Sequence, residues 1–325
     1  MSTKLGKWPL IVYLDQKGWI NLAKLEYGSA KTDEETRLLE TIYRAVEEDK
    51  GIFPLSIVHL DEMPSNKTRR QQLAALMVRL SKGYSFSPYV DNHIAVEVDQ
   101  IVAEKLGYAH IDLRHVFLKQ GVHHLIGSKV EIVSRDGDRN KKPPKEIKEK
   151  MMKMLYDSRA FEFSLTEAKP NPSLRQYQKE AATQMDETRK GLLKIKDKDL
   201  RRRTFLAHNV SAIILPHIVK ILTDRGLPKD FFHMEEWTKD DNERFLAQVP
   251  TGLTLITLTM YRDLQFQRAI NVNDIADVWG LALAIPYCDV VVTERRWVSI
   301  AKQSKLDTIC DTTMLSSIND LMDVL

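Results

Sequence analysis

Carboxylate side chains stand just beyond two apolar runs near the start of this chain, where they could bind a cation. Asp15 directly follows the run Leu10–Leu14, and Glu62 lies on a predicted helix after a second run at 52–55. Short apolar runs of this kind are typical of buried strands in a parallel sheet. Because ligands of such sheets bind beyond the carboxyl ends of the strands, we expect both carboxylates near a binding edge.

Four more carboxylates surround the last apolar run. Asp274 and Asp277 open a predicted helix before the run, Asp289 begins the run and Glu294 ends it. Oxygen ligands of this kind suit hard divalent ions such as Mg²⁺ and Mn²⁺. Such an ion lowers the pKa of bound water and stabilises charge on a phosphoryl group. A cluster of these carboxylates would therefore suit hydrolysis of a phosphodiester bond.

Each acidic position also has a purely structural interpretation. An aspartate after a strand, such as Asp15, is often a turn or cap residue, and Asp274 is a plausible helix N-cap. Asp277 lies one helical turn further on, where acidic residues are common because they interact favourably with the helix dipole. No single position is specific, so the prediction of a site depends on the ordered set.

The apolar periodicity predicts α/β segments at both ends of the chain and a long helical middle. The expected strands lie at 10–14, 52–55, 129–133 and 289–293, with a strand or a helix at 254–260. The expected helices lie at 19–25, 33–48, 57–62, 67–83, 92–106, 111–126, most of 146–224, 274–284 and 297–302. Thr32 or Asp33 is the expected N-cap of the second helix, and Asn273 or Asp274 that of the helix ending at Ala284.

Two segments resemble the PIN-like nuclease domains. Residues 11–23, with Asp15, resemble their first strand and helix, and residues 277–294 resemble their C-terminal signature of an Asp, a small-residue helix and an apolar strand. The resemblance implies an α/β, Rossmann-like parallel sheet flanked by helices, with a large, mostly helical insertion. It places the α/β core at 8–65 plus 251–325 and the insertion or accessory subdomain at 66–250.

The resemblance also implies a site and an activity. Asp15, Glu62 and Asp277 correspond to core ligands of Mg²⁺ or Mn²⁺, and Asp289 or Glu294 to the fourth acidic position, with Asp289 also among the expected catalytic residues. The implied protein is an endonuclease, and single-stranded RNA rather than DNA is its expected substrate. Its relatives suggest a toxin or antiviral-defence role. Glu294 departs from the family pattern because it directly follows Thr293, where many members have an acid one residue later.

Basic side chains concentrate in two segments of the helical middle. Residues 135–153 have eight Lys and Arg against four Asp and Glu, and residues 189–203 have eight against two. Such clusters could bind phosphates, although a solvated helix face has the same composition. The residues expected to contact nucleic acid are Lys17, Arg201, Arg202, Arg203, Arg295 and Arg296.

Two alternatives remain open. Lys17 stands where the family usually has a small or amide residue, and its ammonium group could replace a metal ion in a non-catalytic PIN-like scaffold that binds RNA or protein. Arg203 and His208 have the Arg-x4-His spacing of the HEPN ribonucleases, which cleave RNA without a metal. The first alternative predicts no ion at the acidic cluster, and the second predicts cleavage in EDTA.

Composition narrows the class of protein. The chain has 325 residues, a net charge of +3 and two cysteines without CxxC spacing, so neither a zinc ribbon nor a disulfide scaffold is indicated. Gly-rich phosphate loops and a GxSxG elbow do not occur in the sequence. We expect a cytoplasmic protein without a membrane-spanning segment, which could form a homo-oligomer or bind a regulatory protein.

Overall fold

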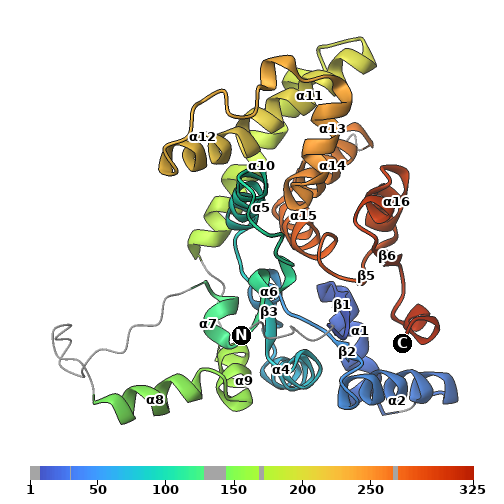
Figure 1. Ribbon diagram of the computed structural model, residues 1–325. Helices are drawn as coiled ribbons and strands as arrows, with labels where there is room; N and C mark the ends of the chain where they lie inside the picture. Colours follow the sequence, from blue (N-terminus) through green and yellow to red (C-terminus); the bar gives the residue numbers. More distant parts are fainter. Residues whose placement is uncertain (1–7, 30, 128–143, 168–171, 266–269) are drawn as a thin grey trace. The chain divides into compact units, whose positions relative to one another are not determined.

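The computed structural model describes residues 8–29, 31–127, 144–167, 172–265 and 270–325 (Figure 1). The protein is a mixed α/β chain with mostly helical residues. It divides into two compact units, the first formed by Met1–Pro88, His115–Pro170 and Leu315–Leu325, and the second by Tyr89–Arg114 and Asn171–Met314. The expected strand at 129–133 and most of the expected loop at 135–145 lie outside the described residues.

Short parallel strands support the α/β fold class that the sequence predicts. Strands β1 (Leu10–Leu14) and β2 (Gly51–Ile52) are neighbours in the first unit, and β5 (Val290–Val292), in the second unit, is a neighbour of β6 (Thr313–Leu315). In the first unit, β1 pairs with β2 so that Leu10 is opposite Gly51 and Ile11 opposite Ile52. The predicted strands at 10–14 and 289–293 are confirmed, and the one at 52–55 is shorter than predicted.

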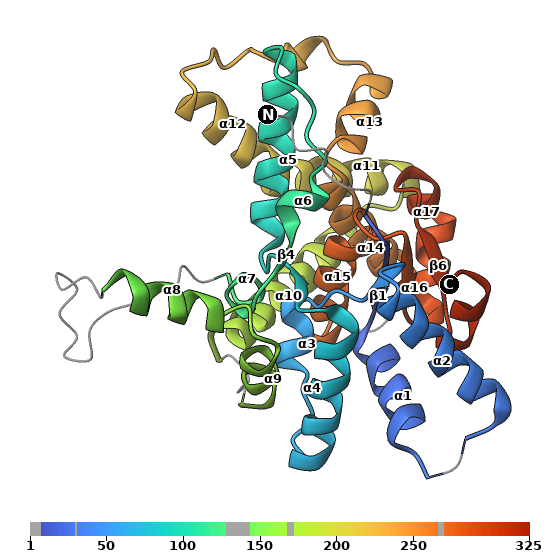
Figure 2. The ribbon, with the colours of Figure 1, turned by 60° about the horizontal axis from the view of Figure 1, so that its bottom comes forward.

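Helices of the first unit contact its strands β1 and β2. Their bounds are Gln16–Tyr27 for α1, Asp33–Glu47 for α2, Ile57–Asp61 for α3, Lys67–Ser81 for α4, Arg114–Phe117 for α6, Val122–Leu125 for α7, Lys145–Met154 for α8 and Ser158–Glu167 for α9. Thr32 is the N-cap of α2, as predicted, because its hydroxyl accepts from Glu35 N and the Glu35 carboxylate accepts from Thr32 N. Helices α4 and α9 lie side by side in both views (Figures 1 and 2).

A second, smaller sheet was not expected. Strands β3 (Tyr84–Phe86) and β4 (Leu118–Gln120) pair antiparallel in the first unit, with Ser85 opposite Lys119. The prediction of helical pieces near 111–126 is confirmed by α6 and α7 and is wrong only for β4, which lies between them. Each strand is only three residues long, and its partner is more than thirty residues away in the chain. Neither strand therefore shows a detectable alternation of apolar and polar residues in the sequence.

The second unit is built almost entirely of helices. Its longer helices are α5 (Val90–Lys105), α10 (Pro172–Leu192), α11 (Lys198–Asn209), α12 (Leu215–Asp224), α13 (Lys239–Ala247), α14 (Pro250–Gln265), α15 (Val272–Ala284) and α16 (Arg295–Gln303). A π-helical stretch, Val210–Ile214, joins α11 to α12, and the short α17 is Leu306–Ile309. Short 3-10 helices lie at Met234–Glu236 and, in the first unit, at Ile318–Asp323.

Two ambiguities of the sequence are resolved in the second unit. Residues 254–260 form part of helix α14. Its Thr251, Thr254 and Thr257 are buried together with its apolar side chains. Helix α15 begins earlier than predicted. Asn271 is its N-cap and Asp274 its third helical residue, and the two side chains form a capping box.

Within the described part of the chain, one continuous helical stretch, Lys198–Asp224, is apolar enough by length and composition alone to cross a bilayer. The mean hydropathy of its most apolar window is 1.6, and 28% of that window is buried. His, Asn and Ser interrupt the apolar residues of this stretch, so the expectation of a protein without a membrane-spanning segment stays a prediction. Buried core helices meet the same standard, so the finding is weak evidence of a membrane span, and the expected cytoplasmic location stays a prediction.

Candidate functional site

Asp15 is the N-cap of α1 in the first unit. Its Oδ1 accepts a hydrogen bond from Gly18 N at 2.7 Å, which satisfies one of the unpaired amides at the helix start. Gly18 favours this close approach, because a Cβ atom there would lie only 3.2 Å from Leu14 Cβ. The structural interpretation of Asp15 is therefore confirmed, and its half-buried carboxylate lies directly after β1 as predicted.

The end of α3 lies beside the start of α1. The Gln16 side chain donates from Nε2 to the carbonyl oxygen of Glu62 at 3.0 Å. The sequence suggested that Glu62 is part of helix α3. In the structure Glu62 is instead the C-cap residue, directly after the last helical residue. These contacts bring the backbones at Asp15 and Glu62 into one region of the first unit, and the exposed Lys17 lies on the same helix.

A buried histidine holds this region together. His59 Nε2 lies 2.9 Å from the carbonyl oxygen of Leu14, and its Nδ1 accepts from Ser56 N at 3.0 Å. Burial lowers the pKa of His59 to about 4, so the ring is neutral and Nε2 carries the proton that it donates to Leu14. His59 therefore fixes the last residue of β1 relative to α3.

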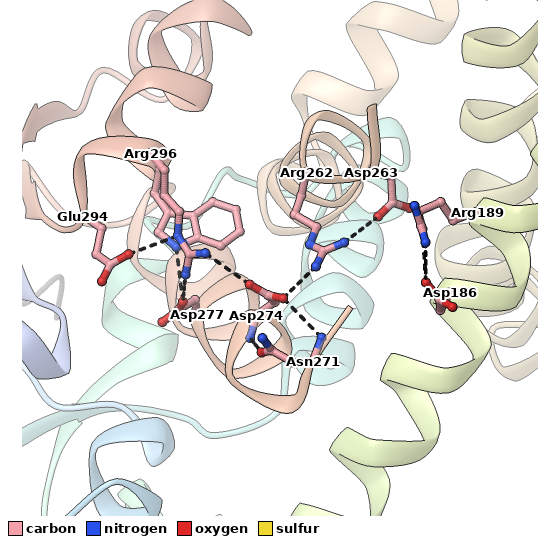
Figure 3. Close-up of polar contacts among 10 residues, drawn as sticks. Asp186, Arg189, Arg262, Asp263, Asn271, Asp274, Asp277, Glu294 and Arg296 are labelled. Carbon is pink, nitrogen blue, oxygen red and sulfur yellow. Dashed lines mark hydrogen bonds and ion pairs between the residues drawn. The ribbon is translucent and has the colours of Figure 1, made fainter. Parts of the chain in front are cut away.

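In the second unit, Asp277 and Glu294 converge on one guanidinium group (Figure 3). Arg296 donates from NH2 to Asp277 Oδ2 at 2.7 Å, and its Nε lies 3.0 Å from Glu294 Oε2. Trp297 Nε1 also donates to Asp277 Oδ2, at 3.3 Å. Asp277 lies in the second turn of α15, and Glu294 is the N-cap residue of α16, after β5. Two of the predicted ligands thus face one position.

The third acid at this position, Asp274, belongs to a buried ion-pair network. Its Oδ2 accepts from Arg262 NH2 at 2.7 Å, and its Oδ1 accepts from Arg296 NH1 at 3.2 Å. Asp274 and Arg262 are 2% and 1% exposed, so each charge depends on the other for compensation. Asp263, beside Arg262, has a pKa that burial raises to about 7 although Arg262 and Arg189 lower it.

The sequence did not identify Arg262 as part of this network. Arg262 lies near the end of α14, a helix of mostly Leu, Ile and Thr. A single arginine on such a helix is a signal for a buried partner, because an isolated buried charge is very costly. The Asn-x-x-Asp spacing of residues 271–274 similarly indicates the capping box and could have located the start of α15.

Asp289 lies apart from Asp277 and Glu294 in its contacts. Its Oδ1 is 3.6 Å from Arg114 NH1, and its carbonyl oxygen accepts from Thr313 N. It precedes β5, whereas Glu294 follows the strand, and five residues of extended chain span roughly 16 Å. The structure therefore brings together Asp277 and Glu294 but not Asp289. The assignment of Asp289 as a catalytic residue or metal ligand stays a prediction.

The predicted nucleic-acid contacts have different environments. Arg201 donates from Nε and NH2 to the carbonyl oxygen of Ile195, and Arg296 belongs to the carboxylate cluster. Arg202, Arg203 and Arg295 are exposed to solvent. His208, the partner of Arg203 in the HEPN-like spacing, is also exposed on α11. Both side chains are therefore accessible to solvent, as a HEPN-type ribonuclease would need.

The donor set of Asp277 and Glu294 fits a hard divalent cation. Each carboxylate has an oxygen 2.7 or 3.0 Å from a nitrogen of the Arg296 guanidinium, and carboxylate oxygens are the ligands that such a cation prefers. Among the residues that the structure describes, the three or more potential ligands whose atoms all lie within 4.8 Å of one another are the exposed His233, Glu235 and Glu236, and Asp274, Asp277 and Glu294 do not form such a group. The sequence did not predict the group at His233, and exposed acidic groups are common without an ion.

Comparison with known proteins gives no relative. A scan against models of protein families matches none, and neither the curated proteins nor the solved structures contain a match to this chain. The resemblance to PIN-like domains therefore rests on the sequence segments alone.

Proposed function

We propose that this protein is a divalent-metal-dependent nuclease that hydrolyses phosphodiester bonds, with single-stranded RNA as its substrate. The observation that carries the proposal is the convergence of Asp277 and Glu294 on one position of the second unit. Mg²⁺ or Mn²⁺ held by these carboxylates would lower the pKa of a bound water and neutralise charge on the scissile phosphate.

The side chains around this position have separate tasks in the proposal. Asp277 and Glu294 supply the oxygen ligands, and Trp297 orients Asp277 through its indole N–H. The exposed Arg295 is available to attract the phosphate backbone, which the carboxylates alone would repel. The resemblance assigns ligand roles to Asp15 and Glu62 in the first unit, and a toxin or antiviral-defence role remains part of the proposal.

The test is cleavage of end-labelled single-stranded RNA, with single-stranded DNA in parallel, in Mn²⁺ and in EDTA. We expect wild-type cleavage in Mn²⁺ only, and a loss of about 10²-fold or more in Asp277→Asn, because an interaction made in the transition state is removed. Asp230→Asn is the matched control, since this aspartate is an exposed loop residue of the same unit. Equal cleavage by Asp277→Asn and wild type would contradict the proposal.

A second candidate function is a non-catalytic scaffold that binds RNA or protein. The observation that favours it is Arg296, whose guanidinium compensates the charges of Asp277 and Glu294 without a metal ion. A scaffold would bind labelled RNA equally well in Mn²⁺ and in EDTA and would cleave in neither. Cleavage that persists in EDTA and disappears in His208→Ala would instead identify the HEPN-like alternative.

A further inference from the structure

Arg296 makes three ion pairs, one through each guanidinium nitrogen (Figure 3). NH2 contacts Asp277 at 2.7 Å, Nε contacts Glu294 at 3.0 Å, and NH1 contacts Asp274 at 3.2 Å. The guanidinium carbon also lies 4.9 Å from the ring centroid of Trp297, within the range of a cation–π contact. The side chain is 27% exposed, so the whole group lies in a partly desolvated place where its charge acts strongly.

The three carboxylates differ in how firmly they are held. Asp274 is buried and is fixed from the other side by Arg262, so it anchors one edge of the guanidinium. Asp277 and Glu294 are 30% and 40% exposed, so both carboxylates are partly accessible to solvent. The guanidinium therefore has a permanent anchor and two contacts that can open without exposing the buried pair.

We propose that Arg296 is an internal counter-ion that competes with a divalent cation for Asp277 and Glu294 and so sets the affinity of this chain for the metal. The proposal rests on the metal site of the proposed function. A guanidinium at 2.7 and 3.0 Å from two oxygens excludes a second cation from the space between those oxygens. Metal binding then requires Arg296 to give up two of its three contacts while it keeps the one to Asp274.

The test is the affinity of the full chain for Mn²⁺ alone, measured by electron paramagnetic resonance of the free ion. We expect Arg296→Gln to bind Mn²⁺ at least about tenfold more tightly than wild type, because a cation in direct contact with both ligands is removed. Arg295→Gln is the matched control, since it removes the same charge one residue away on an exposed side chain. Its effect is expected to be less than about twofold at physiological ionic strength.

Two further variants keep the test independent of folding and of site assignment. Arg296→Lys retains the charge but cannot bridge three carboxylates, so its affinity is expected to lie between those of wild type and Arg296→Gln. Adding Asp277→Asn to Arg296→Gln is expected to remove the gain, because the released ligand is then absent.

Each outcome has a defined meaning. Tighter binding by Arg296→Gln alone, lost in the double variant, supports the counter-ion role. Equal affinities for wild type, Arg296→Gln and Arg295→Gln overturn that role and leave the proposed nuclease intact. Absence of Mn²⁺ binding by both wild type and Arg296→Gln overturns the counter-ion role together with the proposed metal site. Metal binding without cleavage overturns the proposed nuclease alone.

Discussion

Glu97 is a fully buried carboxyl group inside the second unit. Its two oxygens accept from Thr251 N at 3.0 and 3.2 Å, and the Tyr287 hydroxyl donates to Oε1. Burial raises the pKa of Glu97 to about 7, although the hydrogen bonds from Thr251 and Tyr287 lower it. The side chain joins α5 to α14 and thus links packing of this unit to the protonation of one group.

The pH dependence of stability follows from that raised pKa. Between pH 4.5, the ordinary value, and about 7, the folded state holds a proton that the unfolded state has lost. The free energy of unfolding should therefore fall by up to about 3 kcal/mol as pH rises through this window. Urea titrations of wild type and Glu97→Gln at several pH values measure the effect, which the variant should lack.

The control for this prediction is Glu180→Gln, which removes a carboxylate from the exposed face of α10. Its free energy of unfolding should follow the wild-type dependence on pH. The same dependence in wild type and Glu97→Gln would show that Glu97 is not the group responsible.

At the scale of single residues, the sequence identified the types of the site residues better than their environments. Asp15, Asp277 and Glu294 were recognised as carboxylates beside strands and helices, and the last two do converge. Their common partner, Arg296, was expected to contact nucleic acid instead. The identity of a charged residue does not tell whether it faces solvent or an opposite charge, because that depends on the packing of α15 against other elements.

At the scale of elements, α14 packs closely against the π-helical stretch Val210–Ile214. A Cβ atom on Gly252 would lie 3.1 Å from Val249 Cγ1 and 3.2 Å from Ile214 Cδ1, and both of these side chains are fully buried. The glycine therefore permits a close approach within the core of the second unit.

A pair of glycine substitutions tests this packing. Gly252→Ala should lower the free energy of unfolding, because overpacking costs about 1–3 kcal/mol and exceeds the gain in helix propensity of about 0.5–1 kcal/mol. Gly191→Ala, in α10, meets no atom within 4 Å and should be neutral or stabilising. Thermal unfolding of both variants gives the comparison, and a stabilised Gly252→Ala would contradict the close packing.

Elements with strong local signals were predictable. β1 is a continuous apolar run, and α2 has a capping box and a one-sided apolar face, so neighbours in the sequence determine both. The pair β3–β4 and the helical state of residues 254–260 depend on contacts distant in the chain. Short strands and Thr-rich helices are ambiguous in sequence, since burial decides which conformation is formed.

At the scale of the whole molecule, the predicted carboxylates belong to two compact units. Asp15 and Glu62 lie in the first unit, at the start of α1 and the end of α3, and Asp277 and Glu294 lie in the second. The division into a core at 8–65 plus 251–325 and an insertion at 66–250 stays a prediction, because the units are defined by packing rather than by sequence resemblance. The second unit contains a convergent carboxylate pair of its own, and this pair carries the proposed function.

The most direct test of that claim is a Mn²⁺ titration of the wild-type chain and of Asp277→Asn, with Asp230→Asn as the control. We expect one saturable site in wild type and in the control, and an affinity at least about tenfold lower in Asp277→Asn, because even supporting residues of metal sites contribute 10–100-fold. Equal Mn²⁺ affinity in wild type and Asp277→Asn would contradict a metal site at Asp277 and Glu294.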